Sequence, residues 1–122
     1  MKYDWIDEYL LAKKGTEKNL QPEWNWLRYC LGGKMYAAVC MDGEGRPVYI
    51  TLKLEPGEGE FLRGQHEDII PGYYMNKEHW NSVKAEGAVP NDLLREMLDK
   101  SYSLILKGFS RKKQKELLGE GE

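Results

Sequence analysis

With 122 residues, of which 41% are hydrophobic and 31% charged, the chain has the size and composition of one ordinary globular domain. Its formal net charge of −2 and isoelectric point of about 5.8 argue against wholesale nucleic-acid binding, which is typical of domains with an isoelectric point above roughly 9, but they leave room for a local basic patch. No apolar run approaches the roughly 20 residues that cross a bilayer, so we expect a soluble, cytoplasmic protein without membrane contact.

The first segment predicts a short amphipathic helix over residues 4–14. Asp4 is placed to cap this helix, with Asp7 three residues later, and apolar side chains then recur four residues apart. Gly15 is a typical residue for a helix C-terminus. We interpret the stretch that follows, which Pro22 interrupts, as a connector.

From Trp24 the apolar pattern changes to a period of two, which is typical of strands. The segments WNWLRYCL and KMYAAVCM flank two glycines at 32–33 and predict a hairpin with a two-residue turn, in which Tyr29 lies opposite Tyr36. Neither face of this hairpin is cleanly polar. The pattern therefore leaves open which face meets the helices, and a slip of one residue would exchange the two faces.

The two cysteines, Cys30 and Cys40, are consistent with a reducing compartment. In the predicted register Cys30 lies opposite Met35 and Cys40 opposite Asn25, which leaves the sulfur atoms too far apart to bridge without backbone movement. We therefore interpret both thiols as packing groups, because a free cysteine behaves as a small buried hydrophobic residue.

The segment VYITLKL at 48–54 has the clearest strand pattern, because its apolar side chains occupy every second position. The other face of this strand carries Tyr49, Thr51 and Lys53. Residues 58–64 then predict a helix weakened by glycines. Residues 73–76 and 79–85 predict two further strands on either side of a turn.

The last predicted helix begins near Pro90, with Asn91 or Asp92 as its cap, and ends at Gly108. Its expected buried stripe consists of Leu94, Met97, Leu98, Ser101, Tyr102 and Ile105. Residues 109–122 form a charged tail that we expect to be frayed. The tail could contact a phosphate backbone through Arg111, Lys112, Lys113 and Lys115, but Glu116, Glu120 and Glu122 offset this charge.

The predicted element order is α-β-β-β-α-β-β-α. It indicates an α+β fold, in which a twisted antiparallel sheet has its N- and C-terminal helices on one face. We expect one domain over residues 1–108, followed by the tail at 109–122. We also expect the protein to be a monomer.

Four blocks of the sequence resemble, in order, the MmcQ/YjbR family. They are GGKMYAAV (32–39), VYITLKLEP (48–56), PGYYMNKEHWNSV (71–83) and LREMLDKSYSLI (94–105). Together with KGTE at 14–17, the likeness covers about residues 3–108. The block at 71–83 is the most specific, because its string of Gly, Tyr, Asn, Lys, His, Trp and Val rarely arises by chance.

The resemblance implies a frataxin-like (CyaY-like) fold and DNA binding of the type called double-wing. Members of the family are commonly described as predicted DNA-binding proteins. This sequence departs from the family pattern at Tyr74, where histidine is usual, and at Cys30, where a basic residue is common.

A candidate nucleic-acid surface combines the polar face of the 48–54 strand with the segment 71–84. Lysines there would contact phosphates, asparagine would donate to a base edge, and tyrosines would stack on bases, at about 1–3 kcal/mol per base. The candidate residues are Lys34, Tyr49, Lys53, Tyr73, Tyr74, Asn76, Lys77, His79 and Lys84. The alternative is structural: Trp80 and one tyrosine fill the core, and Asn76 bonds the backbone of a tight turn.

No pattern in the sequence points to catalysis, a metal or a cofactor. His66 and His79 have no partner nearby in the sequence, and the common metal, phosphate-loop and nucleophile motifs are missing. The acids around Asp4 and around Glu58 are explained by helix-dipole complementarity and solubility. We therefore expect neither catalytic residues nor metal ligands.

The sequence favours a non-enzymatic binding module. The leading hypothesis is weak binding of DNA or another nucleic acid through the sheet face and the segment 71–84. The alternative is a protein-protein or small-ligand module that uses the same aromatic face, which the acidic isoelectric point favours.

Overall fold

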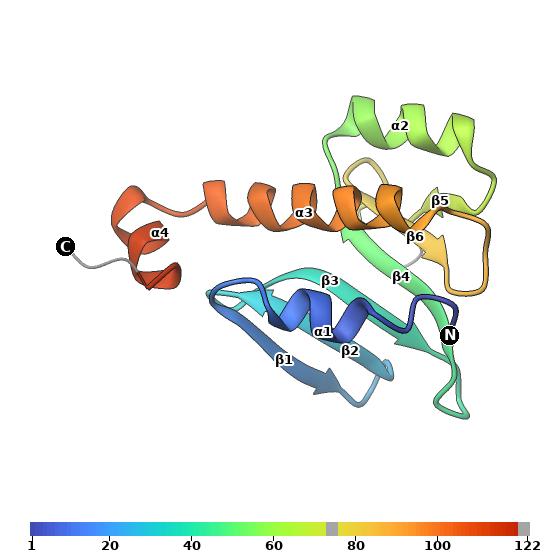
Figure 1. Cartoon of the computed structure of the whole chain (residues 1–122), viewed down its shortest axis with the longest axis horizontal. Coiled ribbons are helices and arrows are strands. Elements are labelled where there is room, and N and C mark those ends of the chain that lie inside the picture. Colours follow the sequence, from blue (N-terminus) through green and yellow to red (C-terminus); the bar gives the residue numbers. More distant parts are fainter. Residues whose placement is uncertain (73–75, 120–122) are drawn as a thin grey trace.

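The structure, a computed structural model, describes residues 1–72 and 76–119. In chain order its elements are α1 (Ile6–Leu11), β1 (Thr16–Gln21), β2 (Trp26–Leu31), β3 (Lys34–Met41), β4 (Pro47–Lys53), α2 (Pro56–Gln65), β5 (Ile69–Pro71), β6 (Trp80–Lys84), α3 (Asn91–Lys107) and α4 (Arg111–Leu117). The described strands form one antiparallel sheet of six, in the order β1-β2-β3-β4-β6-β5. Figure 1 shows α1 and α3 running across this open sheet. The predicted α+β class is confirmed.

The main core lies between the helices and one face of the sheet, and we call it the helix-side core. Leu52 of β4 and Leu98 of α3 are fully buried in it, together with Ile6 of α1. The stripe predicted for α3 is confirmed for Leu94, Met97, Leu98, Ser101 and Ile105, whereas Tyr102 is half-buried. No described helix is both long and apolar enough to cross a membrane.

The helix ends differ from the prediction because side chains near them bond elsewhere. α1 covers Ile6–Leu11, not 4–14, and its N-cap residue is Trp5, with no side-chain cap. α3 also lacks a side-chain cap, since the amide oxygen of Asn91 accepts a hydrogen bond from the Trp5 indole at 3.1 Å. A contact between two helices has therefore replaced the expected local cap.

The predicted connector after α1 contains a strand. β1 pairs antiparallel with β2 along its whole length, from Thr16 opposite Leu31 to Gln21 opposite Trp26. Its four inner residues are exposed, because β1 is an edge strand of the sheet. An edge strand exposed in this way has no apolar alternation to reveal it.

The β2–β3 hairpin contains a β-bulge that the sequence did not reveal. The turn has the expected positive φ values at both glycines, and Cys30 lies opposite Met35 as predicted. Beyond this point the register shifts, so that Tyr29 pairs with Ala37 instead of Tyr36, and Cys40 lies opposite Trp26 instead of Asn25. An extra residue exchanges the two faces of all that follows it on the strand.

The elements predicted after β4 agree in part with the structure. α2 extends the helix predicted at 58–64, with Pro56 at its first turn, and β6 confirms the strand predicted at 79–85. The strand predicted at 73–76 falls almost entirely outside the described residues. β5, at Ile69–Pro71, was not predicted.

The prediction of a frayed tail was wrong for residues 111–117, which form the helix α4. The hydroxyl of Ser110 caps this helix by accepting a hydrogen bond from the Lys113 amide at 3.1 Å. Phe109 and Leu117 pack on the helix-side core, which ties the segment to the domain.

Candidate nucleic-acid interface

The sheet face opposite the helix-side core carries several of the predicted binding residues, and we call it the open face. Its small apolar cluster contains Trp26, Ala38 and Cys40, with Met35 and Tyr49 packed against them. All five residues come from β2, β3 and β4, so no helix that the structure describes contributes to this cluster.

Strand register places the predicted residues of the open face in rows across the sheet. Tyr49 lies between Cys40 on β3 and Lys84 on β6. Four residues further along β4, Lys53 lies opposite Trp80. Alternation along each strand then gives these side chains one common face. The structure thus brings Tyr49, Lys53 and Lys84 together, as predicted.

The floor of the open face is built from small, buried side chains. The Thr51 hydroxyl bonds the Ser82 hydroxyl at 2.9 Å and the Cys40 sulfur at 3.4 Å. Burial raises the pKa of the Cys40 thiol to about 11, so the thiol is protonated at neutral pH. Cys30 and Cys40 are both free and buried, which confirms their interpretation as packing groups.

Two tryptophans that the sequence analysis did not select lie at this face. Trp24 is 58% exposed and makes an edge-on contact with Trp26, with the ring centroids 5.5 Å apart. Trp26 is buried in the open-face cluster. The period of two in WNWLRY could have grouped them, but the orientation of the hairpin was undecided.

Basic side chains surround the buried floor. Arg28 lies opposite Ala38 and donates from Nε to the Asn19 side chain at 2.9 Å. Lys53 is half-buried and forms no ion pair within the described residues. Lys84 lies 3.6 Å from Asp68, a loose surface pair of the kind that contributes little to stability.

A shallow depression of about 600 Å³ adjoins Tyr49 and Lys84. Lys2, Asp68 and Glu86 also line it, so its charge is mixed. It offers room beside the tyrosine ring without being an enclosed pocket.

In the segment before β6, some side chains have structural roles and others are exposed. The Asn76 side chain accepts a hydrogen bond from the Glu78 amide at 2.9 Å, which is the turn-forming role considered for it. Lys77 is exposed, and the His79 carbonyl accepts a hydrogen bond from Leu54. Trp80 is half-buried, with its Cβ close to Gly72. It lies opposite Lys53 and is not part of the helix-side core.

Among the predicted site residues that the structure describes, Lys34 does not join the open face. Lys34 holds its ammonium 5.1 Å over the ring of Phe109, which lies between α3 and α4. The hairpin tip therefore turns this lysine toward the helix side. Tyr73 and Tyr74 lie outside the described residues.

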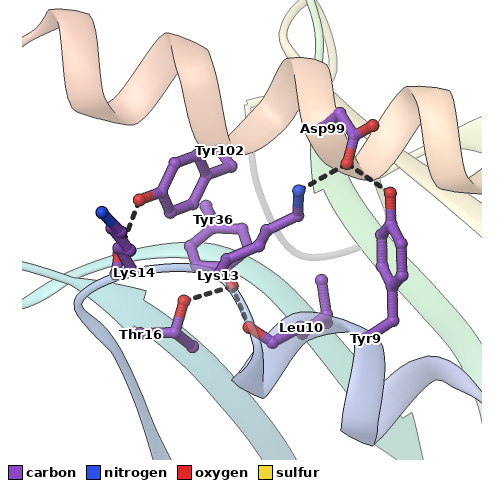
Figure 2. A network of polar contacts seen from close by, with 8 residues as sticks. All are labelled: Tyr9, Leu10, Lys13, Lys14, Thr16, Tyr36, Asp99 and Tyr102. Carbon is purple, nitrogen blue, oxygen red and sulfur yellow. Dashed lines mark hydrogen bonds and ion pairs between the residues drawn. The ribbon is translucent and has the colours of Figure 1, made fainter. Parts of the chain in front are cut away.

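A separate polar cluster holds α1 against α3 (Figure 2). The Asp99 carboxylate accepts hydrogen bonds from the Tyr9 hydroxyl at 2.7 Å and from the Lys13 ammonium at 2.5 Å, and Tyr102 donates to the Lys14 carbonyl at 2.5 Å. Desolvation, followed by the bond to Asp99, raises the pKa of Tyr9 to about 12. The hydroxyl stays neutral and serves as a donor that fastens two helices.

Two acids from the groups around Asp4 and Glu58, Asp7 and Glu58 themselves, have other partners. Within the described residues, no three His, Cys, Asp or Glu side chains converge on a metal position. Hydrogen bonds from Lys18 and then Tyr29 lower the pKa of Asp7, and Glu58 pairs with Lys100.

Comparisons with known proteins agree on one family. The model of the YjbR family matches residues 11–104. Protein YjbR of Escherichia coli strain K12 is 31% identical over 111 residues, covering 91% of this chain and 92% of the relative. Protein YyaQ of Bacillus subtilis strain 168 is also 31% identical over 111 residues, covering 81% and 93%.

Two solved structures show the same architecture. The crystal structure of Deinococcus radiodurans protein DR2400, described as a DUF419 domain, superposes with a TM-score of 0.84 at 33% identity, over 97% of this chain and 88% of the other. A crystal structure of a Pseudomonas syringae protein superposes with a TM-score of 0.69 at 25% identity, over 85% and 98%. The chain belongs to the YjbR family.

Proposed function

We propose that the protein is a non-enzymatic module that binds single-stranded nucleic acid on the open face of its sheet. One observation carries the proposal: an exposed aromatic ring, Trp24, shares this face with Arg28, Lys53 and Lys84. Binding of single strands without base-pair readout combines cations along the phosphate backbone with aromatic rings on which bases stack.

The buried floor supports this proposal because its side chains are small and its hydroxyl groups already have hydrogen-bond partners. Ala38, Thr51 and Ser82 are small, and the two hydroxyls bond each other. Because these hydroxyl groups already bond each other, a ligand would be recognised by the side chains around the floor. Trp24 and Tyr49 would stack on bases there, and Lys53 would contact a phosphate.

The test compares two exposed aromatic residues on different parts of the molecule. Trp24 is 58% exposed at the open face, whereas Phe61 is 64% exposed on α2. We expect Trp24→Ala to reduce affinity for a labelled single-stranded oligonucleotide by roughly 5- to 150-fold, since stacking contributes about 1–3 kcal/mol per base. Phe61→Ala should leave affinity unchanged. Fluorescence anisotropy at about 50 mM salt measures both.

Equal affinities of the two variants would contradict the proposal, as would an absence of binding by the wild type at this salt concentration. In the latter case the protein-protein or small-ligand alternative gains weight. An apolar interface of that kind holds or strengthens as salt rises, whereas phosphate contacts weaken.

A further inference from the structure

The short helix α4 is held in a built docking site at one end of the sheet (Figure 1). Gly15 and Gly32 have φ values of 79° and 57°, a backbone region that favours glycine. A Cβ on Gly15 would lie 2.6 Å from the Leu117 carbonyl oxygen, and one on Gly32 would lie 2.7 Å from the Phe109 ring. The α1–β1 turn and the β2–β3 turn therefore both leave space that α4 and its connection fill.

This docking determines which side of α4 meets the solvent. Gln114, Leu117 and Leu118 are half-buried, and the Gln114 amide donates to the Phe109 carbonyl at 2.8 Å. The remaining positions of the helix face outward. A helix tethered through one side presents the other in a constant orientation.

The outward side of α4 and the neighbouring turns carry a group of cations that we call the α4 surface. Its members are Lys14, Lys34, Arg111, Lys112 and Lys115. All five are exposed, and none forms an ion pair within the described residues. Lys113 differs, because its ammonium lies 3.7 Å from the Glu116 carboxylate.

We infer that the α4 surface is a second nucleic-acid contact that binds the phosphate backbone through charge alone. The inference rests on the proposed function for its ligand class, but concerns a different part of the molecule. Its physical basis is a concentration of cations that form no ion pair within the described residues, on a protein whose net charge is −2. Each phosphate that such a group neutralises releases counterions and adds to affinity.

The composition of the α4 surface favours a phosphate backbone over an acidic protein. Protein interfaces depend on buried aromatic or aliphatic anchors. Here the apolar residues Phe109 and Leu117 are turned toward the domain. Apart from Glu116, which is paired with Lys113, the charged groups that face outward on α4 are ammonium and guanidinium groups, so a regular polyanion is the complementary partner.

A DNA duplex of random sequence, about 20 base pairs long, tests the inference separately from the open face, because paired bases cannot stack on Trp24. The variant is Lys112→Gln/Lys115→Gln. The matched control, Lys18→Gln/Arg46→Gln, changes the net charge equally, but its cations are already paired with Asp7, Asp42 and Glu44. Circular dichroism melts verify that each variant is folded.

The measured quantity is the slope of log K against log salt concentration between about 50 and 200 mM. We expect the slope of the Lys112→Gln/Lys115→Gln variant to be smaller in magnitude by about 1.8, at about 0.9 per phosphate contact. Salt should therefore weaken binding of the variant roughly tenfold less than binding of the wild type across that range. The control should keep the wild-type slope. Equal slopes for variant and control overturn the inference.

The two proposals fail in different ways. Duplex binding that depends on α4, without any effect of Trp24→Ala on single strands, supports the α4 surface and contradicts the open-face proposal. Single-strand binding that depends on Trp24, without duplex binding, does the reverse. Binding of labelled polyglutamate instead of duplex DNA also overturns the inference, since it identifies an acidic polypeptide as the partner.

Discussion

Aromatic side chains on the two faces of the sheet are used in opposite ways. Five tyrosines lie in or against the helix-side core, and the hydroxyl of each donates a hydrogen bond. Tyr3 donates to the Val89 carbonyl, Tyr9 to Asp99, Tyr29 to Asp7, Tyr36 to the Leu10 carbonyl and Tyr102 to the Lys14 carbonyl. On the open face, Trp24 extends into solvent and Tyr49 is half-buried.

Hydroxyl partners distinguish structural aromatic residues from candidate binding residues in this domain. A buried tyrosine needs a partner for its hydroxyl, because an unsatisfied buried polar group costs about 1–3 kcal/mol. The tyrosines around α1 and α3 meet this requirement, so the fold itself explains their presence. The exposed ring of Trp24 lies on the same face as Lys53, which forms no ion pair within the described residues, and it has no such explanation within the fold. It is therefore the better candidate for contacting a ligand.

The strongest test of this comparison removes one large side chain from each region. Leu98→Ala should lower the free energy of unfolding by about 2–5 kcal/mol, because it opens a cavity in the helix-side core. Trp24→Ala should cost about 1 kcal/mol or less, since it loses mainly an edge-on contact with Trp26. Urea unfolding followed by circular dichroism measures both. A comparable loss in the two variants would make Trp24 a structural residue.

A smaller effect separates two tyrosines that differ in their hydroxyl partners. The fully buried Tyr36 hydroxyl lies 2.7 Å from the Thr16 hydroxyl and 3.3 Å from the Leu10 carbonyl. Tyr36→Phe should therefore cost about 1 kcal/mol of stability. Tyr49→Phe should change stability by less than about 0.5 kcal/mol. If Tyr49→Phe were the more destabilising change, the open face would contain a hydrogen bond important for folding.

The smallest expected effect concerns acid stability at the junction of α1 and the sheet. Hydrogen bonds from Lys18 and Tyr29 hold the pKa of Asp7 below its usual value of 3.8. A lowered pKa in the folded state means that the carboxylate stabilises the fold above the unfolded pKa and loses this contribution as pH falls through the folded value. Wild type should lose more stability than Asp7→Asn between about pH 5 and pH 2. Equal losses in urea titrations would show that Asp7 contributes nothing.

Local pattern was sufficient for much of the architecture. The alternation in 48–54 correctly put Ile50 and Leu52 on the buried face of β4 and buried Leu54 just beyond its end, whereas Val48 is 39% exposed. The stripe on α3 and its end at Gly108 also follow from the sequence, because helix periodicity and a glycine stop act over a few residues. The block at 71–83 was enough to indicate the family.

The candidate site was predictable only where it lay on that well-patterned strand. Tyr49 and Lys53 share one face of β4 in any register, and Lys84 joined them through pairing with β6. Trp24 was missed because its hairpin could not be oriented. Lys34 was placed on the wrong surface, because a residue at a turn can face either side.

What remained depended on contacts between distant parts of the chain. The bulge beside Tyr36 sends Val39 to the helix side and Cys40 to the open face, an exchange that no alternation of small apolar residues could reveal. The helix α4 is held in place in the same way, because Phe109 and Leu117 fill the space beside two glycines that lie far earlier in the sequence. Local periodicity reports which residues form an element, whereas the face it presents and the neighbours it meets are set by packing across the whole domain.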